Sequence, residues 1–495
     1  MNVAPTQLHA SYQAKGHYIG GEWVRPRATF KDMNPATGQV YCNAPEANRI
    51  DVAAAVDAAS AAFRPWAALP HTVRADYMLK IADIYERRRD EIVSHIVSEG
   101  GGWFGKGMFE TGYVHGVWRA AAASCYEEVG ELLPSDHLKV SMAVRRPMGV
   151  VSVISPWNFP MILSSRGMAF ALAAGNTVVL KPSEETPVIG GLLFAEIFEE
   201  AGVPPGVLNV VTCSRDAVAE VGDELVSNPR VKGVSFTGST PVGRKIAGRA
   251  GELLKSFCVE LGGKNALLVF ADADMDRSVQ AANFGSFMHQ GQICMSVDRL
   301  LVQDTIVDEF TRRFVEKAAT LKKGDPAADK GNVIGPIIND RQVARIKDQL
   351  DDAVSKGAQV LLGGRVDGLF VEPTILTGVN DTMKIYREET FGPVTSIYPF
   401  STEEEALRLA NDSDYGLSAG VMTGDEERGL AMAAELETGM CHINCSPVND
   451  EAMVPFGGAK GSGSGRHGGK WAINTFTETR WVTLERGHRH FPPVF

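Results

Sequence analysis

The sequence predicts an α/β protein built on a doubly wound parallel sheet of the nucleotide-binding kind. Three observations lead to this class. Apolar, β-branched runs recur every ~25–30 residues through the middle of the chain, with helical segments between them. A second series of such runs follows after residue 262. The chain has 495 residues, of which 44% are hydrophobic, enough for the cores of two or three domains.

The first series of elements begins with an Ala-rich helical pattern from Asp51 to about Arg89. We expect a helix between the second and third strands, with Thr186 as its N-cap, Pro187 at its first position and Gly202 just past its end. The predicted strands are GVVSVIS (149–155), NTVVLK (176–181), VLNVVT (207–212), VKGVSF (231–236) and SFCVEL (256–261).

The second series predicts another sheet, in which each strand has a helical neighbour. Cys294 falls early in this part, on a loop after a helix. Two further segments, SMAVRRPMG (141–149) and FTETRWVTLE (476–485), alternate like exposed strands, and pairing across subunits would remove their free edges. The strands of the second sheet are NALLVF (265–270), RLLVQ (299–303), AQVLLGG (358–364), LSAGVMTG (417–424) and GMCHIN (439–444).

Charge and cysteine content narrow the class of protein. The net charge is −11, and Lys and Arg are scattered, which argues against nucleic acid and anionic membrane surfaces as partners. Seven cysteines form an odd, sparse set that fits a reducing compartment rather than a disulfide framework. The N-terminal stretch has no apolar signal region, and no run approaches the ~18 apolar residues of a membrane span. We therefore expect a soluble, cytoplasmic protein.

Several short motifs carry candidate chemistry. The fingerprint GxGxxG is missing after the first strand, where SPWNFP stands instead. The later turn FTGSTPVG places Gly238, Ser239 and Gly243 between a strand and a helix, where backbone N–H groups bind phosphate. In KPSEET, Lys181 and Glu184 follow the second strand, either as a solvated turn or at a nucleotide's ribose, where a carboxylate suits the diol and repels a 2′-phosphate.

Two further residues leave two interpretations open. Glu260 ends an apolar strand, so it is either a working carboxylate or one that caps a helix or meets a cation. Cys294, in QGQICMS, is either a packed thiol or a nucleophile.

Seven motifs in order resemble those of the aldehyde dehydrogenase superfamily: PWNFP, KPSEE, FTGSTPVG, ELGGKN, GQIC, EETFGP (388–393) and PFGGAKGSGSGR (455–466). The resemblance covers the chain from about His17 to the C-terminus. It implies a Rossmann-like NAD-binding domain (1–127 and 147–261), an α/β catalytic domain (262–455) and a small β oligomerisation arm (128–146 and 476–495). Residues 456–475 return to the NAD-binding region, and the assembly would be a homodimer or homotetramer.

The resemblance also implies a mechanism and its residues. Cys294 matches the nucleophile that forms a thiohemiacetal, Asn158 the oxyanion donor, and Glu260 the base that activates water to hydrolyse the thioester to an acid. The cofactor is NAD, favoured by Glu184, with NADP as a second option. The matched cofactor-binding residues are Ser155, Pro156, Trp157, Lys181, Ser183, Glu184, Gly238, Ser239, Gly243, Leu261, Glu389 and Phe391.

The sequence around several of these motifs resembles the branch of the family that acts on benzaldehyde, salicylaldehyde and vanillin. An apolar slot for a flat ring would follow from Phe159, Ile162, Ile293 and Met295, although any one of them alone fits an ordinary core. Arg166 keeps a semialdehyde open as the alternative substrate, since it could bind a carboxylate. An aliphatic aldehyde as substrate, and a non-catalytic NAD-binding scaffold in place of an enzyme, also stay open.

One position departs from the usual sequence of the family, and one group of residues resembles a metal site. His467, in SGRHGG, stands where many relatives have a glutamate that relays protons; it is either a proton shuttle or an inert surface residue. Cys441, His442 and Cys445 look metal-like, but the spacing lacks a fourth ligand, so we expect no metal there.

Overall fold

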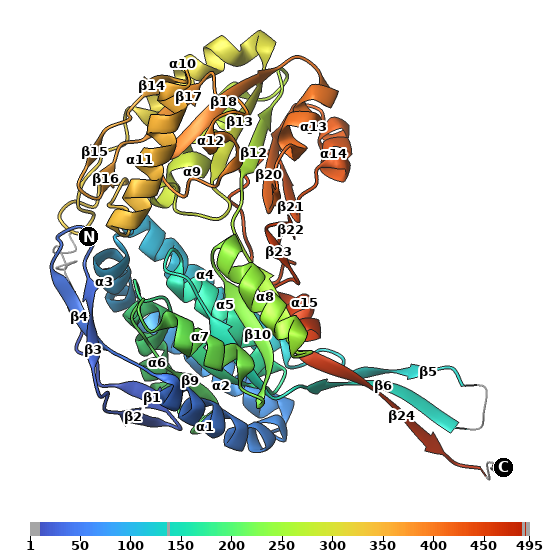
Figure 1. The fold of residues 1–495 in the computed structure, drawn as a ribbon. Coiled ribbons are helices and arrows are strands. Elements are labelled where there is room, and N and C mark those ends of the chain that lie inside the picture. The colour runs from blue at the N-terminus through green and yellow to red at the C-terminus, as the bar shows by residue number, and fades with distance from the viewer. Residues whose placement is uncertain (1–9, 136–138, 488–490, 492–495) are drawn as a thin grey trace.

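The computed structural model describes residues 10–135, 139–487 and 491, and it contains two large sheets and a protruding arm (Figure 1). The first sheet has the order β2-β1-β9-β8-β7-β10-β11-β23, and its five inner strands are parallel. All five runs predicted for it are strands. Its members are β1 (His17–Ile19), β2 (Glu22–Val24), β7 (Val150–Ile154), β8 (Thr177–Lys181), β9 (Leu208–Val210), β10 (Val231–Thr237), β11 (Ser256–Glu260) and β23 (Gly463–Ser464).

The strand order reverses between β7 and β10, which are neighbours in the sheet but not in the chain. In open α/β sheets, ligands bind at such a switch point, beyond the carboxyl ends of the strands. The loops after β7 and β10 carry SPWNFP and the Gly238 turn, so the sheet brings both motifs to the same place.

Helices cover both faces of this sheet, which explains why β7 and β8 are buried at every residue. One hydrophobic cluster includes Trp66, Trp118 and Phe170, and a second lies around Val179, Val234 and Phe236. The predicted helical region from Asp51 to about Arg89 is helical and consists of two helices, α1 and α2. The helices are α1 (Arg49–Ala67), α2 (His71–Arg87), α3 (Arg89–Gly100), α4 (Phe104–Ser124), α5 (Pro160–Ala173), η1 (Val188–Leu192), α6 (Leu193–Ala201), α7 (Val218–Ser227), α8 (Thr240–Glu252) and α15 (Gly469–Thr475).

The predicted cap at Thr186 is wrong. Within the described residues its hydroxyl makes no hydrogen bond. The backbone N–H groups of Val188 and Ile189 instead donate to the buried carboxylate of Glu99, each at 2.7 Å. The segment begins as the π-helical turn η1, and α6 continues it to Gly202, which takes the left-handed conformation predicted for a C-cap (φ 69°).

The second sheet has the order β14-β17-β18-β13-β12-β20-β21 and is parallel except for β14. Its five predicted strands are present, and clusters around Leu268 and Phe310 cover its two faces. The strands are β12 (Asn265–Val269), β13 (Val297–Gln303), β14 (Gln359–Leu362), β17 (Thr374–Thr377), β18 (Val394–Phe400), β20 (Ser418–Met422) and β21 (Met440–Ile443). The helices are α9 (Met275–Phe287), η2 (Met288–Gly291), η3 (Asp304–Ile306), α10 (Val307–Ala318), α11 (Asp340–Ser355), α12 (Lys384–Arg387), α13 (Glu403–Asn411) and α14 (Glu426–Glu435).

The two alternating segments predicted as exposed strands pair with each other, and with a third strand, in an arm that projects from the body (Figure 1). The arm consists of β5 (Gly130–Leu133), β6 (Lys139–Pro147) and β24 (Thr477–Glu485), in the order β24-β6-β5. Residues 1–9 of the predicted NAD-binding domain, and residues 136–138, 488–490 and 492–495 of the predicted arm, lie outside the described residues. Short pairs complete the structure: β3 (Thr29–Met33) with β4 (Val40–Pro45), β15 (Val366–Asp367) with β16 (Phe370–Val371), and β19 (Tyr415–Gly416) with β22 (Ala459–Lys460).

Candidate active site

A first cavity, of about 140 Å³, lies beyond the carboxyl ends of β7 and β10. Helix α8 begins beside it, and within the described residues no side chain caps its start. The unpaired N–H groups and the helix dipole therefore favour an anion at this point. Seven of the predicted cofactor-binding residues line the cavity: Pro156, Trp157, Gly238, Ser239, Leu261, Glu389 and Phe391.

Glu389 and Phe391 come to this cavity from the other sheet. The buried Glu389 carboxylate accepts the N–H of Gly263 at 3.0 Å, and burial raises its pKa to about 7. Phe391 has a left-handed backbone (φ 55°), and its ring meets Trp157 edge-on, with centroids 5.3 Å apart. The cavity therefore has the ionisable Glu389 on one wall and the aromatic pair of Trp157 and Phe391 on another.

The other five predicted cofactor-binding residues do not line this cavity. Lys181 is buried, with its Nζ 3.9 Å from the Glu184 carboxylate, which Arg215 also approaches at 3.4 Å. Ser183 accepts the N–H of Glu185 at 3.2 Å. The remaining two act within the fold: the Ser155 and Ser164 hydroxyls share a hydrogen bond of 2.6 Å, and a Cβ on Gly243 would lie 2.2 Å from Leu261, so this glycine permits close packing of α8.

Cys294 is held by an unusual loop. The three residues His289, Gln290 and Gly291 are all left-handed, with φ of 49°, 55° and 68°. This run turns the chain sharply after α9 and brings Cys294 toward Asn158. Asn265 fixes the loop from the other side, because its amide donates to the carbonyl oxygens of Cys294 and Ser296 at 2.8 and 2.9 Å.

A second cavity, of about 310 Å³, lies on the other side of Cys294. Its walls are mostly apolar, and all five predicted pocket residues line it: Phe159, Ile162, Arg166, Ile293 and Met295. The sequence reasoning did not identify the other large apolar walls: Phe109, Leu163, Phe284, Met288, Val448 and Phe456. In the first cavity it missed Leu163, Thr237, Gly262, Gln342 and Arg345. Aromatic residues in FETGYVHGVW on α4 were the available signal for Phe109.

Asn158 and Cys294 each line both cavities. The Asn158 side-chain amide donates to the Gln292 carbonyl oxygen at 3.0 Å, which aims it at the cysteine loop. Cys294 is half-buried, and its pKa is raised to about 12, chiefly by burial and next by the carboxylate of Glu389. A half-buried thiol and an amide donor thus meet at the junction of an apolar cavity and a cavity at the switch point.

Arg166 projects into the apolar cavity but is not free. Its guanidinium forms an ion pair with Asp450, donates to the Tyr113 hydroxyl at 2.9 Å and stacks over the Phe456 ring at 3.9 Å. Within this cavity, therefore, its charge is already compensated by a carboxylate of the same chain.

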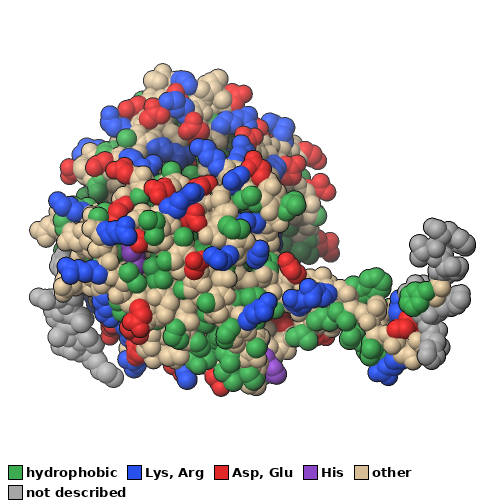
Figure 2. Space-filling model, turned by 60° about the horizontal axis from the view of Figure 1, so that its bottom comes forward, with side chains coloured by type: hydrophobic (Ala, Val, Ile, Leu, Met, Phe, Trp, Pro, Cys, Tyr) green, Lys and Arg blue, Asp and Glu red, His purple; other side chains and the backbone are tan. Residues whose placement is uncertain are grey.

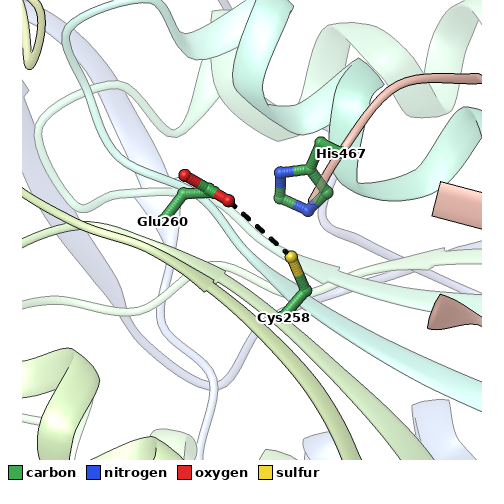
Figure 3. A group of neighbouring side chains, drawn as sticks. All are labelled: Cys258, Glu260 and His467. Carbon is green, nitrogen blue, oxygen red and sulfur yellow. Dashed lines mark hydrogen bonds between the residues drawn. The ribbon is translucent and has the colours of Figure 1, made fainter. Parts of the chain in front are cut away.

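Glu260 lines neither cavity. It lies at the end of β11, 2% exposed, and its Oε1 is 3.9 Å from the Cys258 thiol, while Oε2 has no hydrogen-bond partner within the described part of the chain. Burial raises its pKa well above the usual range, against the opposing charges of Arg166 and Arg466. His467 lies beside both residues (Figure 3) and is 1% exposed, so the interpretation of an inert surface residue is wrong. Burial lowers its pKa to about 3.

The doubly wound sheet places a cavity and a cysteine at its switch point, where proteins of the nucleotide-binding α/β class bind their ligands. The chain matches the Aldehyde dehydrogenase family over residues 23–482 and belongs to that family.

Relatives match over nearly the whole chain. Vanillin dehydrogenase of Pseudomonas fluorescens is 43% identical, with 96% of this chain and 98% of that protein covered. Benzaldehyde dehydrogenase YfmT of Bacillus subtilis is 42% identical, with the same coverage of 96% and 98%. Among solved structures, a salicylaldehyde dehydrogenase from Pseudomonas putida G7, complexed with salicylaldehyde, has a TM-score of 0.95 at 40% identity and covers 97% of this chain and 99% of that one. In the described part of this chain, no helix combines the length and apolarity that a bilayer crossing requires.

Proposed function

We propose that this protein oxidises an aromatic aldehyde to its carboxylic acid with NAD. The observation that supports this most directly is the shared position of Cys294 and Asn158, which line both an apolar cavity and the cavity at the switch point. An aldehyde in the apolar cavity and a nicotinamide in the other would meet at this thiol. The printed names of the relatives, which include a benzaldehyde dehydrogenase [NAD(+)] of Pseudomonas putida, support the same substrate class and cofactor.

The chemistry follows from what each side chain can do. Cys294 gives its thiol proton to a base, and its sulfur adds to the carbonyl carbon to form a thiohemiacetal. The oxyanion of this adduct is stabilised by the Asn158 amide and the backbone N–H of Cys294. NAD supplies the hydride acceptor that turns this adduct into a thioester. Glu260, once turned toward the thioester, takes a proton from water as the water attacks, and the acid leaves with Cys294 restored as a thiol.

The residues around the first cavity fit a dinucleotide. The uncapped start of α8 suits a pyrophosphate, and the Glu389 carboxylate suits the hydroxyls of the nicotinamide ribose. Lys181 and Glu184 stand together at the end of β8, as contacts to an adenine ribose require. Two exposed arginines beside Glu184, Arg215 and Arg341, would suit a 2′-phosphate, so NADP remains a second cofactor.

The second cavity favours an aromatic over an anionic aldehyde. Its walls include the rings of Phe109, Phe159, Phe284 and Phe456, which suit a flat apolar ring. The semialdehyde hypothesis depended on Arg166 as a carboxylate receptor, and the pairing of Arg166 with Asp450 disfavours that role.

A panel of aldehydes tests the proposal. We expect NADH to form with benzaldehyde at a kcat/KM well above that for succinic semialdehyde, measured by absorbance. Cys294→Ala should lose this activity and keep NAD binding, and Asn158→Ala should lower kcat by roughly 10²–10³-fold. Activity retained in Cys294→Ala would rule out the assigned nucleophile, and iodoacetamide labelling of Cys294 is the independent check against a non-catalytic scaffold.

The same proposal includes the organisation and setting of the protein. We propose an NAD-binding domain around the first sheet, a catalytic domain around the second, and self-association through the arm, supported by the free edges of β24 and β5. All seven cysteines lie in described residues and are free, which supports a reducing compartment such as the cytoplasm.

A further inference from the structure

Three buried side chains with potential metal-binding atoms lie close together outside the two cavities: Cys258, Glu260 and His467. Cys258 and Glu260 are two residues apart on β11, so both point to the same face of the sheet. His467 reaches them from the segment after β23. Their candidate donor atoms all lie within 4.8 Å of one another, and the three residues are 0, 2 and 1% exposed. Figure 3 shows the three side chains pointing toward a common centre.

The cluster is not satisfied by hydrogen bonds of its own. Glu260 Oε2 and His467 Nδ1 are buried and have no partner among the described residues. The only bond that joins Cys258 to Glu260 is the weak thiol contact of 3.9 Å. Buried polar atoms are nearly always paired, so two unpaired polar atoms in one cluster of candidate ligands favour a missing ligand there.

We propose that Cys258, Glu260 and His467 bind a divalent cation of the zinc class, and that the bound cation withdraws Glu260 from the reaction. Thiolate, imidazole and carboxylate are the ligand types that zinc prefers, and three of them leave a fourth position for water. Binding replaces the thiol proton of Cys258, which passes to solvent as the sulfur–metal bond forms, with no change of oxidation state.

The surroundings fit this assignment. His467 Nε2 lies 3.0 Å from the Ser235 hydroxyl, and a hydrogen bond donated there leaves Nδ1 with its lone pair for a metal. Gly457 and Gly465 leave room for the cluster, since a Cβ at these positions would lie 2.5 Å from Glu260 Oε1 and 2.8 Å from Cys258 Sγ.

Two arginines decide how firmly the cation is held. The guanidinium groups of Arg166 and Arg466 are the positive charges that act on Cys258 and Glu260. The same positive charges repel a cation. We therefore expect a reversible, inhibitory site rather than a permanently filled one.

Cobalt titration of the full-length Cys294→Ala protein tests binding without interference from the reactive thiol. We expect a near-ultraviolet thiolate-to-cobalt band that reaches one Co²⁺ per chain. Further substitution of Cys258→Ser should abolish the band, and His467→Phe should weaken Co²⁺ binding by at least about 100-fold, because even groups outside the ligand shell contribute 10–100-fold. Cys441→Ser, in the other metal-like motif, is the matched control and should leave the band unchanged. A band that survives Cys258→Ser overturns the proposal.

Zinc inhibition of the active enzyme tests the consequence, which alone rests on the proposed function. Zn²⁺ should slow acid formation by the unaltered protein, and His467→Phe should need at least about 100-fold more Zn²⁺ for the same effect. Equal sensitivity of the two proteins overturns the inhibitory role. An anomalous-scattering peak among the three side chains in zinc-soaked crystals needs no variant, and its absence contradicts the site. If no aldehyde is oxidised, the proposed function fails while the cobalt result still stands.

Discussion

Cys294 is a protonated thiol at rest, because burial and the neighbouring Glu389 carboxylate raise its pKa to about 12. A thiolate forms in such a place only when a base removes the proton. Burial also raises the pKa of Glu260 well above that of an ordinary carboxyl group. Cys294 therefore needs a proton acceptor before it can act as the proposed nucleophile.

Glu389 gives the first prediction at this scale. Its pKa of about 7 means that the carboxylate is protonated below neutral pH and charged above it. A charged carboxylate is the better acceptor for ribose hydroxyls, so the affinity for NAD should increase as the pH rises through about 7. Fluorescence titrations of NAD between pH 6 and 8.5 measure this. In Glu389→Gln the affinity should be weaker and flat across this range; an unchanged slope in the variant would contradict the assignment.

The ion pair between Arg166 and Asp450 gives a second prediction, which concerns substrate selectivity. Asp450→Asn leaves the arginine charge uncompensated in an apolar cavity, where it should attract a substrate carboxylate. We expect the ratio of kcat/KM for succinic semialdehyde to that for benzaldehyde to rise at least about tenfold. The double variant Arg166→Met with Asp450→Asn is the control and should lose that gain. No change in the ratio would show that Arg166 does not control selectivity.

Pairings such as this one show the limit of sequence reasoning at the residue scale. All five predicted pocket residues line the second cavity, because motif and chain position suffice to place them. The partner of Arg166 is 284 residues away, and a contact at that separation depends on the fold. The burial of His467 beside Glu260 has the same origin. Glu260 lies on β11 and His467 follows β23, and these two strands become neighbours only after folding.

At the scale of elements, two buried glutamates support the site. Glu110 on α4 accepts the N–H groups of Met161 and Ile162 at 2.9 and 3.2 Å, so it caps the start of α5, the helix that follows Asn158. Its second oxygen pairs with Lys106. Glu99 does the same for η1, in place of the expected Thr186. A cap that lies next to a helix in the sequence can be predicted from the local residues. A cap that comes from another helix cannot, which is why the prediction of Thr186 as the N-cap failed.

Loss of the Glu110 cap should destabilise the protein strongly. Glu110→Ala removes two hydrogen bonds from the helix start and leaves Lys106 buried without its counterion, at a cost of roughly 3–5 kcal/mol in the free energy of unfolding. Urea denaturation followed by circular dichroism measures it. The double variant Lys106→Met with Glu110→Gln keeps an oxygen for the cap and removes both charges, so it should lose less. Equal losses in the two variants would contradict this account of the ion pair.

At the scale of the whole molecule, the arm exposes apolar side chains and strand edges that a single chain does not cover. Among the described residues, its outer strands β24 and β5 each pair on one side only. The arm also carries exposed apolar side chains, among them Leu132 (78% exposed) and Trp481 (66%). Figure 2 shows hydrophobic side chains on the visible face of the arm. Alternating patterns predicted two of its strands as exposed segments, but their antiparallel pairing joins residues more than 300 positions apart.

The molar mass of the protein in solution tests whether it self-associates through the arm. Trp481→Asp combined with Leu132→Asp should shift the protein from an oligomer to a monomer of 53.3 kDa, measured by light scattering after gel filtration. Leu430→Asp is the matched control, because Leu430 is 63% exposed but lies on α14, far from the arm (Figure 1), and this variant should remain oligomeric. An oligomer that persists in the arm variant would place the interface elsewhere.

The three left-handed residues before Cys294 also limit how this chain can diverge. Left-handed backbone costs roughly 1–2 kcal/mol at an ordinary L-residue, so His289 and Gln290 are held there by the rest of the fold. A β-branched residue at either position would tend to pull the loop out of shape, and the thiol with it. Relatives can therefore change the walls of the apolar cavity, and with them the substrate, much more freely than the turn that presents the sulfur. A laboratory search for new substrates has the best prospects if it varies those walls and leaves residues 289–291 alone.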